Sequence, residues 1–147
     1  MAEAAEKNGA TIHWAKDATE HNEIVLDLLR KHNAGKVVKS KSMLTEECCL
    51  DDFLCDNGIN VIESDLGERI LQLLNQPPSH IVMPAIHLKR LIIGKLFEEK
   101  LHTEEGNSDP TYLTGCMREN LRQEFLSTEV AMTGANFGIA ETGDVVV

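Results

Sequence analysis

The sequence predicts an α/β fold in which a mostly parallel, Rossmann-like sheet is flanked by helices. Short runs of β-branched residues alternate with longer segments whose apolar residues recur at helical spacing. Most connections between the runs are long enough for the crossover helices that parallel strands require. One such domain is expected over residues 1–147, since domains typically hold ~100–150 residues.

The first half of the chain is expected to alternate strands with helices. A helix should end before Gly9, a favourable residue just beyond a helix C-terminus. A second begins at Asp17, which forms a capping-box pattern with Glu20. A third carries residues 48–54 and ends at Gly58. The expected strands of this half are Thr11–Trp14, Lys36–Lys39 and Ile59–Glu63.

The second half continues this alternation. Asp65 and Glu68 form another capping-box pattern, and Pro77-Pro78 ends the helix that follows. A strand is expected over Ile81–Met83, closed by Pro84. The next helix carries, at helical spacing, Leu88, Leu91, Ile92 and Leu96.

One more helix and two strands are expected at the end of the chain. The helix begins at Asp109-Pro110, an N-cap with proline at the first helical position. It carries a row of apolar residues, namely Leu113, Met117, Leu121 and Phe125. The strands Glu129–Met132 and Asp144–Val147 should form a hairpin or near-hairpin. Because Val145–Val147 resembles a strand cut before its natural end, the chain is expected to be a fragment.

The composition excludes several classes of protein. The chain has 24 acidic and 14 basic residues, a net charge of −10, and 42% hydrophobic residues. It can therefore form a core, but it lacks the basic surface that nucleic-acid binding requires. Its apolar runs are far shorter than the ~18 residues of a membrane span. The acidic start of the chain has no secretion signal, so we expect a cytoplasmic protein.

No metal site is expected within this chain. The four cysteines do not form the close Cys-x-x-Cys pairs typical of zinc and iron–sulfur sites, and the six histidines are scattered. The simplest interpretation is that the cysteines are small buried hydrophobic residues. They are Cys48, Cys49, Cys55 and Cys116.

An anion site is one interpretation of the loop that follows the strand Lys36–Lys39. Ligands of open parallel sheets gather at the carboxyl ends of strands. Two ammonium groups and two hydroxyls occur together here, on Lys39, Ser40, Lys41 and Ser42. Positive charge and a helix N-terminus favour an anion. The alternative is a solvated loop in which Ser42 or Thr45 caps the next helix.

Three other loops offer further candidates. His87 could act as an acid, a base or a ligand donor, or it could be structural. Glu63 and Asp65 could form a carboxylate pair, although Asp65 is more simply an N-cap. The glycine-rich end of the chain allows close approach of a ligand, although turn geometry also explains its glycines. Its candidates are Gly134, Asn136, Glu141 and Thr142.

Four stretches of the sequence together resemble one protein family. They are Val37–Glu47, Glu63–Glu68, Pro77–His87 and Thr133–Gly143. Their order and residues closely resemble the lactate-utilization (LUD) domain of the lactate utilization protein B family, from about Ala2 onward. Members of that family are iron–sulfur subunits of a bacterial system that oxidises L-lactate to pyruvate.

The resemblance implies several expectations. The fold should be of the NagB/RpiA/CoA-transferase-like class, and the partners should be companion subunits of a lactate oxidation complex. The 4Fe–4S clusters are expected only in a C-terminal region of full-length relatives, so this chain should bind no cofactor. The family supplies no catalytic residues to carry over, but its four stretches coincide with the candidate loops identified above. On that agreement we expect Lys39, Ser40 and Lys41 to hold a small anionic metabolite as its carboxylate or phosphate, and His87 and Glu141 to supply proton or hydrogen-bond chemistry.

Two alternatives remain open at this point. The chain could be a stand-alone member of the same fold class that binds or converts sugar phosphates or CoA esters. It could also be a pure scaffold whose loops contact partner subunits. The strand-forming residues Val145–Val147 fit a scaffold, because an unprotected strand edge invites pairing with another chain, including a second copy in a homodimer.

Overall fold

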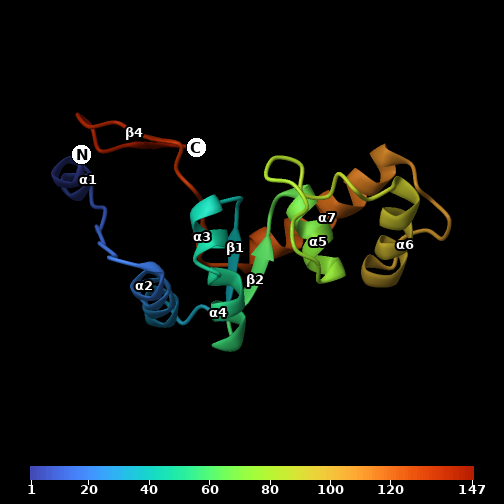
Figure 1. Cartoon of the computed structure of the whole chain (residues 1–147), viewed down its shortest axis with the longest axis horizontal. Coiled ribbons are helices and arrows are strands. Elements are labelled where there is room, and N and C mark those ends of the chain that lie inside the picture. The colour runs from blue at the N-terminus through green and yellow to red at the C-terminus, as the bar shows by residue number, and fades with distance from the viewer. The chain divides into compact units, whose positions relative to one another are not determined.

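The computed structural model describes residues 1–147 and confirms an α/β fold with a parallel sheet flanked by helices (Figure 1). The chain divides into two compact units. The first unit comprises Met1–Val61 and Glu129–Val147, and the second comprises Ile62–Thr128. Strand β2 begins in the first unit and continues into the second.

The first unit contains a three-stranded sheet, four helices and a terminal hairpin. Its helices are α1 (Ala2–Lys7), α2 (Ala18–Lys31), α3 (Met43–Glu47) and α4 (Leu50–Asp56). Its sheet strands are β1 (Lys36–Lys39), β2 (Asn60–Glu63) and β3 (Ala131–Met132). Its hairpin strands are β4 (Phe137–Gly138) and β5 (Val145–Val146).

The central strand of the sheet is β1, in the order β2-β1-β3. β1 and β3 run parallel, with Val38 opposite Ala131 and Lys39 opposite Met132. The carboxyl ends of these two strands therefore lie at the same edge of the sheet. Helices α2 and α4 supply the side chains that fill the core beside β1, of which the most enclosed are Leu29, Leu50 and Leu54.

The second unit consists of three helices joined by long loops. They are α5 (Leu66–Leu74), α6 (Arg90–Leu101) and α7 (Pro110–Ser127). α6 packs against both α5 and α7. The expected apolar row of α7 is buried at Leu113, Met117 and Leu121, whereas Phe125 is exposed.

Several local signals in the sequence are confirmed. Asp17 caps α2 by accepting a hydrogen bond of 2.9 Å from the backbone N–H of Glu20. The Glu20 carboxylate accepts in turn from the N–H of Lys16, one residue before the expected position. Asp109 caps α7 in the same way, with Pro110 at the first helical position.

Two of the expected strands are wrong. Thr11–Trp14 pairs with no strand, and Trp14 is 80% exposed. Ile81–Met83 forms bends and turns instead. The backbone N–H groups of Val82 and Met83 both donate to the His80 ring nitrogen Nδ1, which curls this segment around the imidazole. Those amides are therefore not available to a strand partner.

Some expected helices also differ from the structure. The helix expected around residues 48–54 is broken at Cys49, whose positive φ of 50° separates α3 from α4. Asp65 precedes α5, but its side chain makes no capping hydrogen bond. On α6, Leu91 and Ile92 of the expected apolar face are exposed, and the helix buries Gly94, Leu96 and Phe97 instead.

The end of the chain forms a different pairing from the expected one. The strand within Glu129–Met132 joins the sheet through β1, so it is not half of a hairpin with the terminal strand. The terminal strand β5 pairs antiparallel with β4, which lies in the segment expected to be a connection.

This hairpin holds the first helix of the chain. The Asn8 side-chain amide donates to the Thr142 carbonyl at 2.8 Å, and Ala5 is buried. Gly143 has a φ of +80°, and any Cβ there would collide with the backbone of Ala4 and Ala5. The glycine therefore allows helix α1 to lie directly against the hairpin.

None of the helices in the structure is both long and apolar enough to cross a lipid bilayer.

The core of the first unit can be tested at Leu54, which has 0% exposure. We expect Leu54→Ala to lower the free energy of unfolding by about 2–5 kcal/mol, because it leaves a cavity among close-packed side chains. Urea unfolding followed by circular dichroism measures the change. The matched control is Leu44→Ala, on a residue that is 59% exposed, for which a change within about 0.5 kcal/mol is expected. Equal losses in the two variants would contradict this description of the core.

The contact between α1 and the hairpin can be tested at Gly143. We expect Gly143→Ala to release α1, so that trypsin cleaves after Lys7 faster than in the unchanged chain. The control is Gly58→Ala, which has a similar φ of +79° but meets no atom within 4 Å. If both variants are cleaved after Lys7 at the same rate, the contact does not hold α1 in place.

Candidate functional site

A cluster of hydroxyl groups lies where β1 and β3 end. The Ser40 and Thr133 hydroxyls share a hydrogen bond of 2.8 Å, and the Ser40 N–H donates to the Met132 carbonyl. A Cβ on Gly134 would lie 3.2 Å from the Lys41 carbonyl oxygen and 3.4 Å from the Ser42 Cβ. The structure thus brings together residues from two of the sequence-predicted loops. We call Ser40, Lys41, Ser42, Thr133 and Gly134 the loop cluster.

Ser42 has two functions in this geometry. Its hydroxyl oxygen accepts a hydrogen bond of 3.5 Å from the Thr45 N–H and thereby caps α3. Its backbone carbonyl accepts from the Thr45 hydroxyl at 2.9 Å. The capping role that the sequence allowed as an alternative is therefore present.

Lys39 lies beneath the loop cluster and not on its surface. Its side chain is 1% exposed, with the ammonium nitrogen 3.5 Å from the Thr45 hydroxyl and 3.6 Å from an Asp51 carboxylate oxygen. A buried cation has to be compensated by such partners, since its desolvation is costly. In this arrangement Lys39 connects β1 with α3 and α4, while Lys41 is the half-buried cation of the cluster itself.

His87 lies in a second arrangement, within the second unit. The Ser79 hydroxyl lies 2.7 Å from the Pro84 carbonyl and 2.7 Å from His87 Nδ1. A carbonyl can only accept, so the single hydroxyl proton goes to Pro84 and His87 Nδ1–H donates to Ser79. The neutral ring then carries no proton on Nε2. His87 therefore presents a proton acceptor on an exposed loop.

Glu63 and Asp65 flank the start of α5. Glu63 is buried at the end of β2, and its N–H donates to the Gln72 side-chain oxygen. Nearby, burial lowers the pKa of Arg69 below its usual range, while the carboxylates of Glu124 and Glu63 act in the opposite direction. Asp65 accepts the Arg69 N–H through its backbone carbonyl. Glu63 is therefore buried, whereas Asp65 is partly exposed at the start of α5.

The remaining candidates lie in the terminal hairpin. The Asn136 N–H donates to the Val146 carbonyl, and the Thr142 carbonyl accepts from Asn8. Glu141 is exposed in the turn between β4 and β5. Its proposed chemical partner His87 belongs to the other unit.

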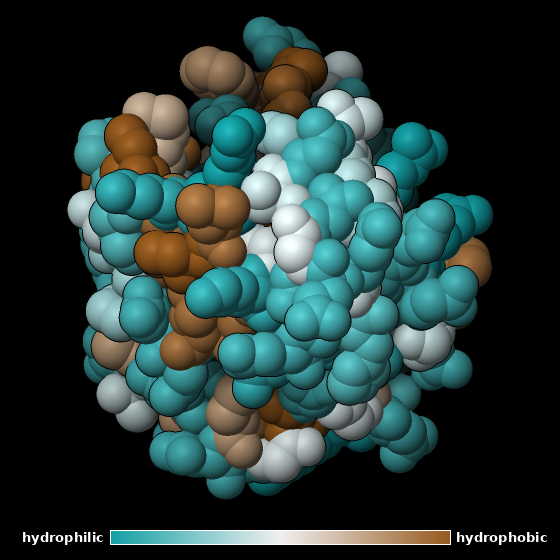
Figure 2. Space-filling view, turned by 90° about the vertical axis from the view of Figure 1, so that its right-hand side faces the viewer, coloured by the Kyte–Doolittle hydropathy of each residue, from teal (hydrophilic) through white to brown (hydrophobic).

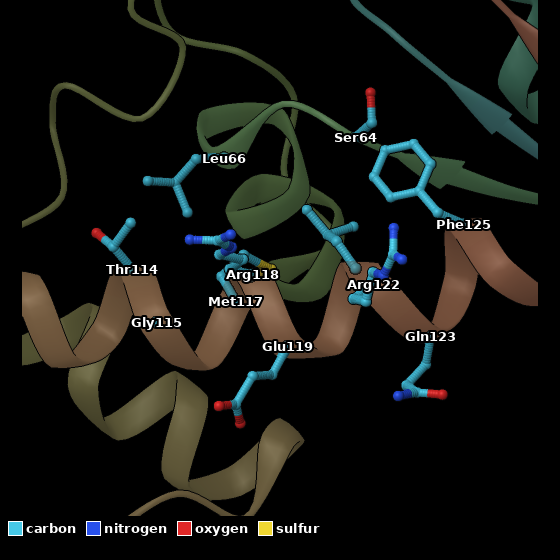
Figure 3. A pocket seen from close by; sticks show the side chains of 11 residues that line it. Ser64, Leu66, Thr114, Gly115, Met117, Arg118, Glu119, Arg122, Gln123 and Phe125 are labelled. Carbon is cyan, nitrogen blue, oxygen red and sulfur yellow. The ribbon is translucent and has the colours of Figure 1, made fainter.

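Sequence reasoning missed one feature, an open groove along α7 with a volume of about 1110 Å³. Figure 3 shows Leu66 and Phe125 facing the same side of α7 as Arg118 and Arg122. The signal in the sequence was the four-residue spacing of two arginines beside an apolar row, within an acidic chain. All lining residues of this groove belong to the second unit.

The residues of this chain do not fit an iron–sulfur cluster. All four cysteines are free: Cys48 and Cys116 are half-buried, and Cys49 and Cys55 are exposed. The expectation that they are buried is therefore wrong for two of them. No group of three or more histidine, cysteine, aspartate or glutamate side chains is placed to hold a metal ion.

Comparison with known proteins identifies the family. The LUD domain family matches residues 1–147, the whole chain. The chain belongs to the LUD domain family. The resemblance found in the four sequence stretches is thereby confirmed, and this LUD domain match covers both structural units.

Named relatives of this LUD domain chain come from several bacteria. It is 45% identical over 145 residues to the "Uncharacterized electron transport protein YkgF" of Escherichia coli strain K12. It is 46% identical to "Lactate utilization protein B" of Oceanobacillus iheyensis and 43% identical to the protein of that name from Bacillus cereus strain AH820. Each match covers 99% of this chain but only 30% of the relative. No solved structure matches.

The proton positions in the Ser79–His87 loop of this LUD domain chain can be tested directly. We expect nitrogen-15 NMR of the neutral rings to find the proton of His87 on Nδ1 and that of His80 on Nε2, because His80 Nδ1 accepts two backbone N–H groups. Ser79→Ala should shift His87 toward the other tautomer and leave His80 unchanged. A proton on Nε2 of His87 in the unchanged chain would contradict the assignment.

Proposed function

We propose that this chain is the LUD domain of an iron–sulfur subunit that takes part in the oxidation of L-lactate to pyruvate. The similarity to lactate utilization protein B across 99% of the chain supports this proposal. The name of the Escherichia coli relative, an electron transport protein, agrees with it. Since the chain spans about 30% of the length of these relatives, we assign the clusters of such a subunit to residues outside the matched region.

In this proposal the domain has two tasks. It holds companion subunits together, and it binds a small anionic ligand at the loop cluster. The observation that carries the second task is the meeting of Ser40 with Thr133 at the ends of two parallel strands, next to Lys41. Hydroxyl groups and an ammonium are the donors that a carboxylate requires. Lactate and pyruvate each carry one carboxylate, which fits a cluster of this size.

The participation of His87 is a separate part of the proposal. Oxidation of a 2-hydroxy acid removes two electrons and two protons, one of them from the hydroxyl group. A neutral imidazole with an open Nε2 can accept such a proton. The hydrogen bond from Nδ1 to Ser79 would steady the ring in that role.

The role in lactate oxidation is tested in the source cells. We expect loss of the gene that encodes this chain to reduce L-lactate consumption, while consumption of glucose stays unchanged. Restoring the unchanged gene should restore L-lactate consumption. Unaltered L-lactate consumption without the gene would exclude the proposed role.

Ligand binding is tested with the purified chain, by titration with L-lactate, pyruvate, a sugar phosphate and coenzyme A under ligand-observed NMR. We expect L-lactate or pyruvate to bind, and Ser40→Ala with Thr133→Ala to weaken binding about tenfold, since hydrogen bonds to a charged group contribute about 1.5–3 kcal/mol. The control is Thr19→Ala, an exposed hydroxyl on α2. Equal affinity in all variants would exclude the loop cluster as the site. A preference for the sugar phosphate or coenzyme A would favour the stand-alone alternative.

A further inference from the structure

The groove along α7 is lined on one side by apolar side chains that the second unit does not cover. Leu66 and Phe125, 42% and 50% exposed, flank it, and Met117 and Leu121 form part of its floor. Figure 3 shows the lining residues of α7 in a row along the helix, from Thr114 to Phe125. Exposed apolar side chains that border a hollow are typical of a binding surface.

Two arginines give the groove a positive charge. Arg118 and Arg122 lie four residues apart, so they are one helical turn from each other on the same face. Neither guanidinium makes a hydrogen bond or ion pair with another residue of the chain. Glu119 and Gln123 also line the groove, although their side chains point to the other side of α7 in Figure 3. Although the chain has a net charge of −10, the groove lining carries two arginines and one acidic residue, Glu119.

We propose that the groove binds an amphipathic, acidic helix of a partner protein. Its apolar side chains would cover Leu66 and Phe125, and two carboxylates one turn apart would pair with Arg118 and Arg122. The length agrees: from Thr114 to Phe125 a helix advances ~16 Å at ~1.5 Å per residue, or about three turns. Helices that bind in grooves use apolar residues repeated at this spacing.

The dimensions and charges of the groove disfavour the other occupants. Pockets for small molecules have volumes of ~300–1,000 Å³ and enclose their ligand. This groove is open, and Arg118, Arg122 and Phe125 are all exposed to solvent, so it does not enclose a ligand in this way. A second copy whose two-fold axis passes through the groove would bring the arginines of the two copies close together.

This inference does not rest on the proposed function. It uses only residues of the second unit, whereas the loop cluster lies in the first. A partner of this chemistry can therefore bind whether or not the chain binds lactate.

The proposal is tested with the full chain and two synthetic helical peptides, measured by fluorescence anisotropy. One peptide carries leucines at helical spacing with glutamates four residues apart, and the other has lysine in place of each glutamate. We expect the acidic peptide to bind at least about tenfold more tightly than the basic one, and to be weakened by salt. Arg118→Glu with Arg122→Glu should reverse this preference.

Two further variants separate the contributions of charge and apolar contact. Lys16→Glu with Lys31→Glu makes the same change in net charge on exposed residues of the first unit, and should keep the preference for the acidic peptide. Phe125→Ala should weaken the binding of the acidic peptide. Circular dichroism and melting temperature confirm that each variant is folded.

Several results would overturn the proposal. One is equal or absent binding of the two peptides, and another is an arginine variant that behaves like the lysine variant. Binding to phosphatidylglycerol vesicles in preference to the acidic peptide would identify a membrane surface instead. Sedimentation that finds a dimer, dissociated by the arginine substitutions, would assign the groove to a second copy of the chain.

Discussion

The parallel pairing of β1 with β3 is the interaction on which the first unit depends. It joins residues 38–39 to residues 131–132, so the chain that leaves through the second unit must return to the same sheet. The pairing closes the sheet beside β1 and places Thr133 next to Ser40. Closing so long a loop is entropically costly, and the buried core around Val37, Leu50 and Leu54 offsets this cost.

Much of the fold was predictable from the sequence because its signals are local. The capping box at Asp17, the N-cap at Asp109-Pro110 and the β-branched run at Lys36–Lys39 act within a few residues, so they identified α2, α7 and β1. The failed strand at Ile81–Met83 depends on His80, whose ring nitrogen accepts two backbone N–H groups. Strand propensity cannot predict this outcome, because the His80 ring competes with a neighbouring strand for the same backbone N–H groups.

The candidate site was predictable to a similar extent. The rule that parallel strands end at one edge located Ser40 and Gly134 in a common cluster. It did not anticipate the position of Lys39, whose side chain follows that of Val37 on the same face of β1. Helices cover β1, so a lysine there is enclosed and requires Asp51. The Arg118–Arg122 groove was missed because it depends on α5 packing beside α7, which no local pattern specifies.

The contact between α1 and the terminal hairpin has a consequence for the order of synthesis. The hydrogen bond from Asn8 to Thr142 joins residues separated by 134 positions. At ~5–20 residues per second, a ribosome needs roughly 7–27 s to deliver the second partner after the first. During that time α1 emerges without its docking surface. Glu3 and Glu6, which are exposed on α1, place charge on this alanine-rich segment and so favour its hydration while the hairpin is absent.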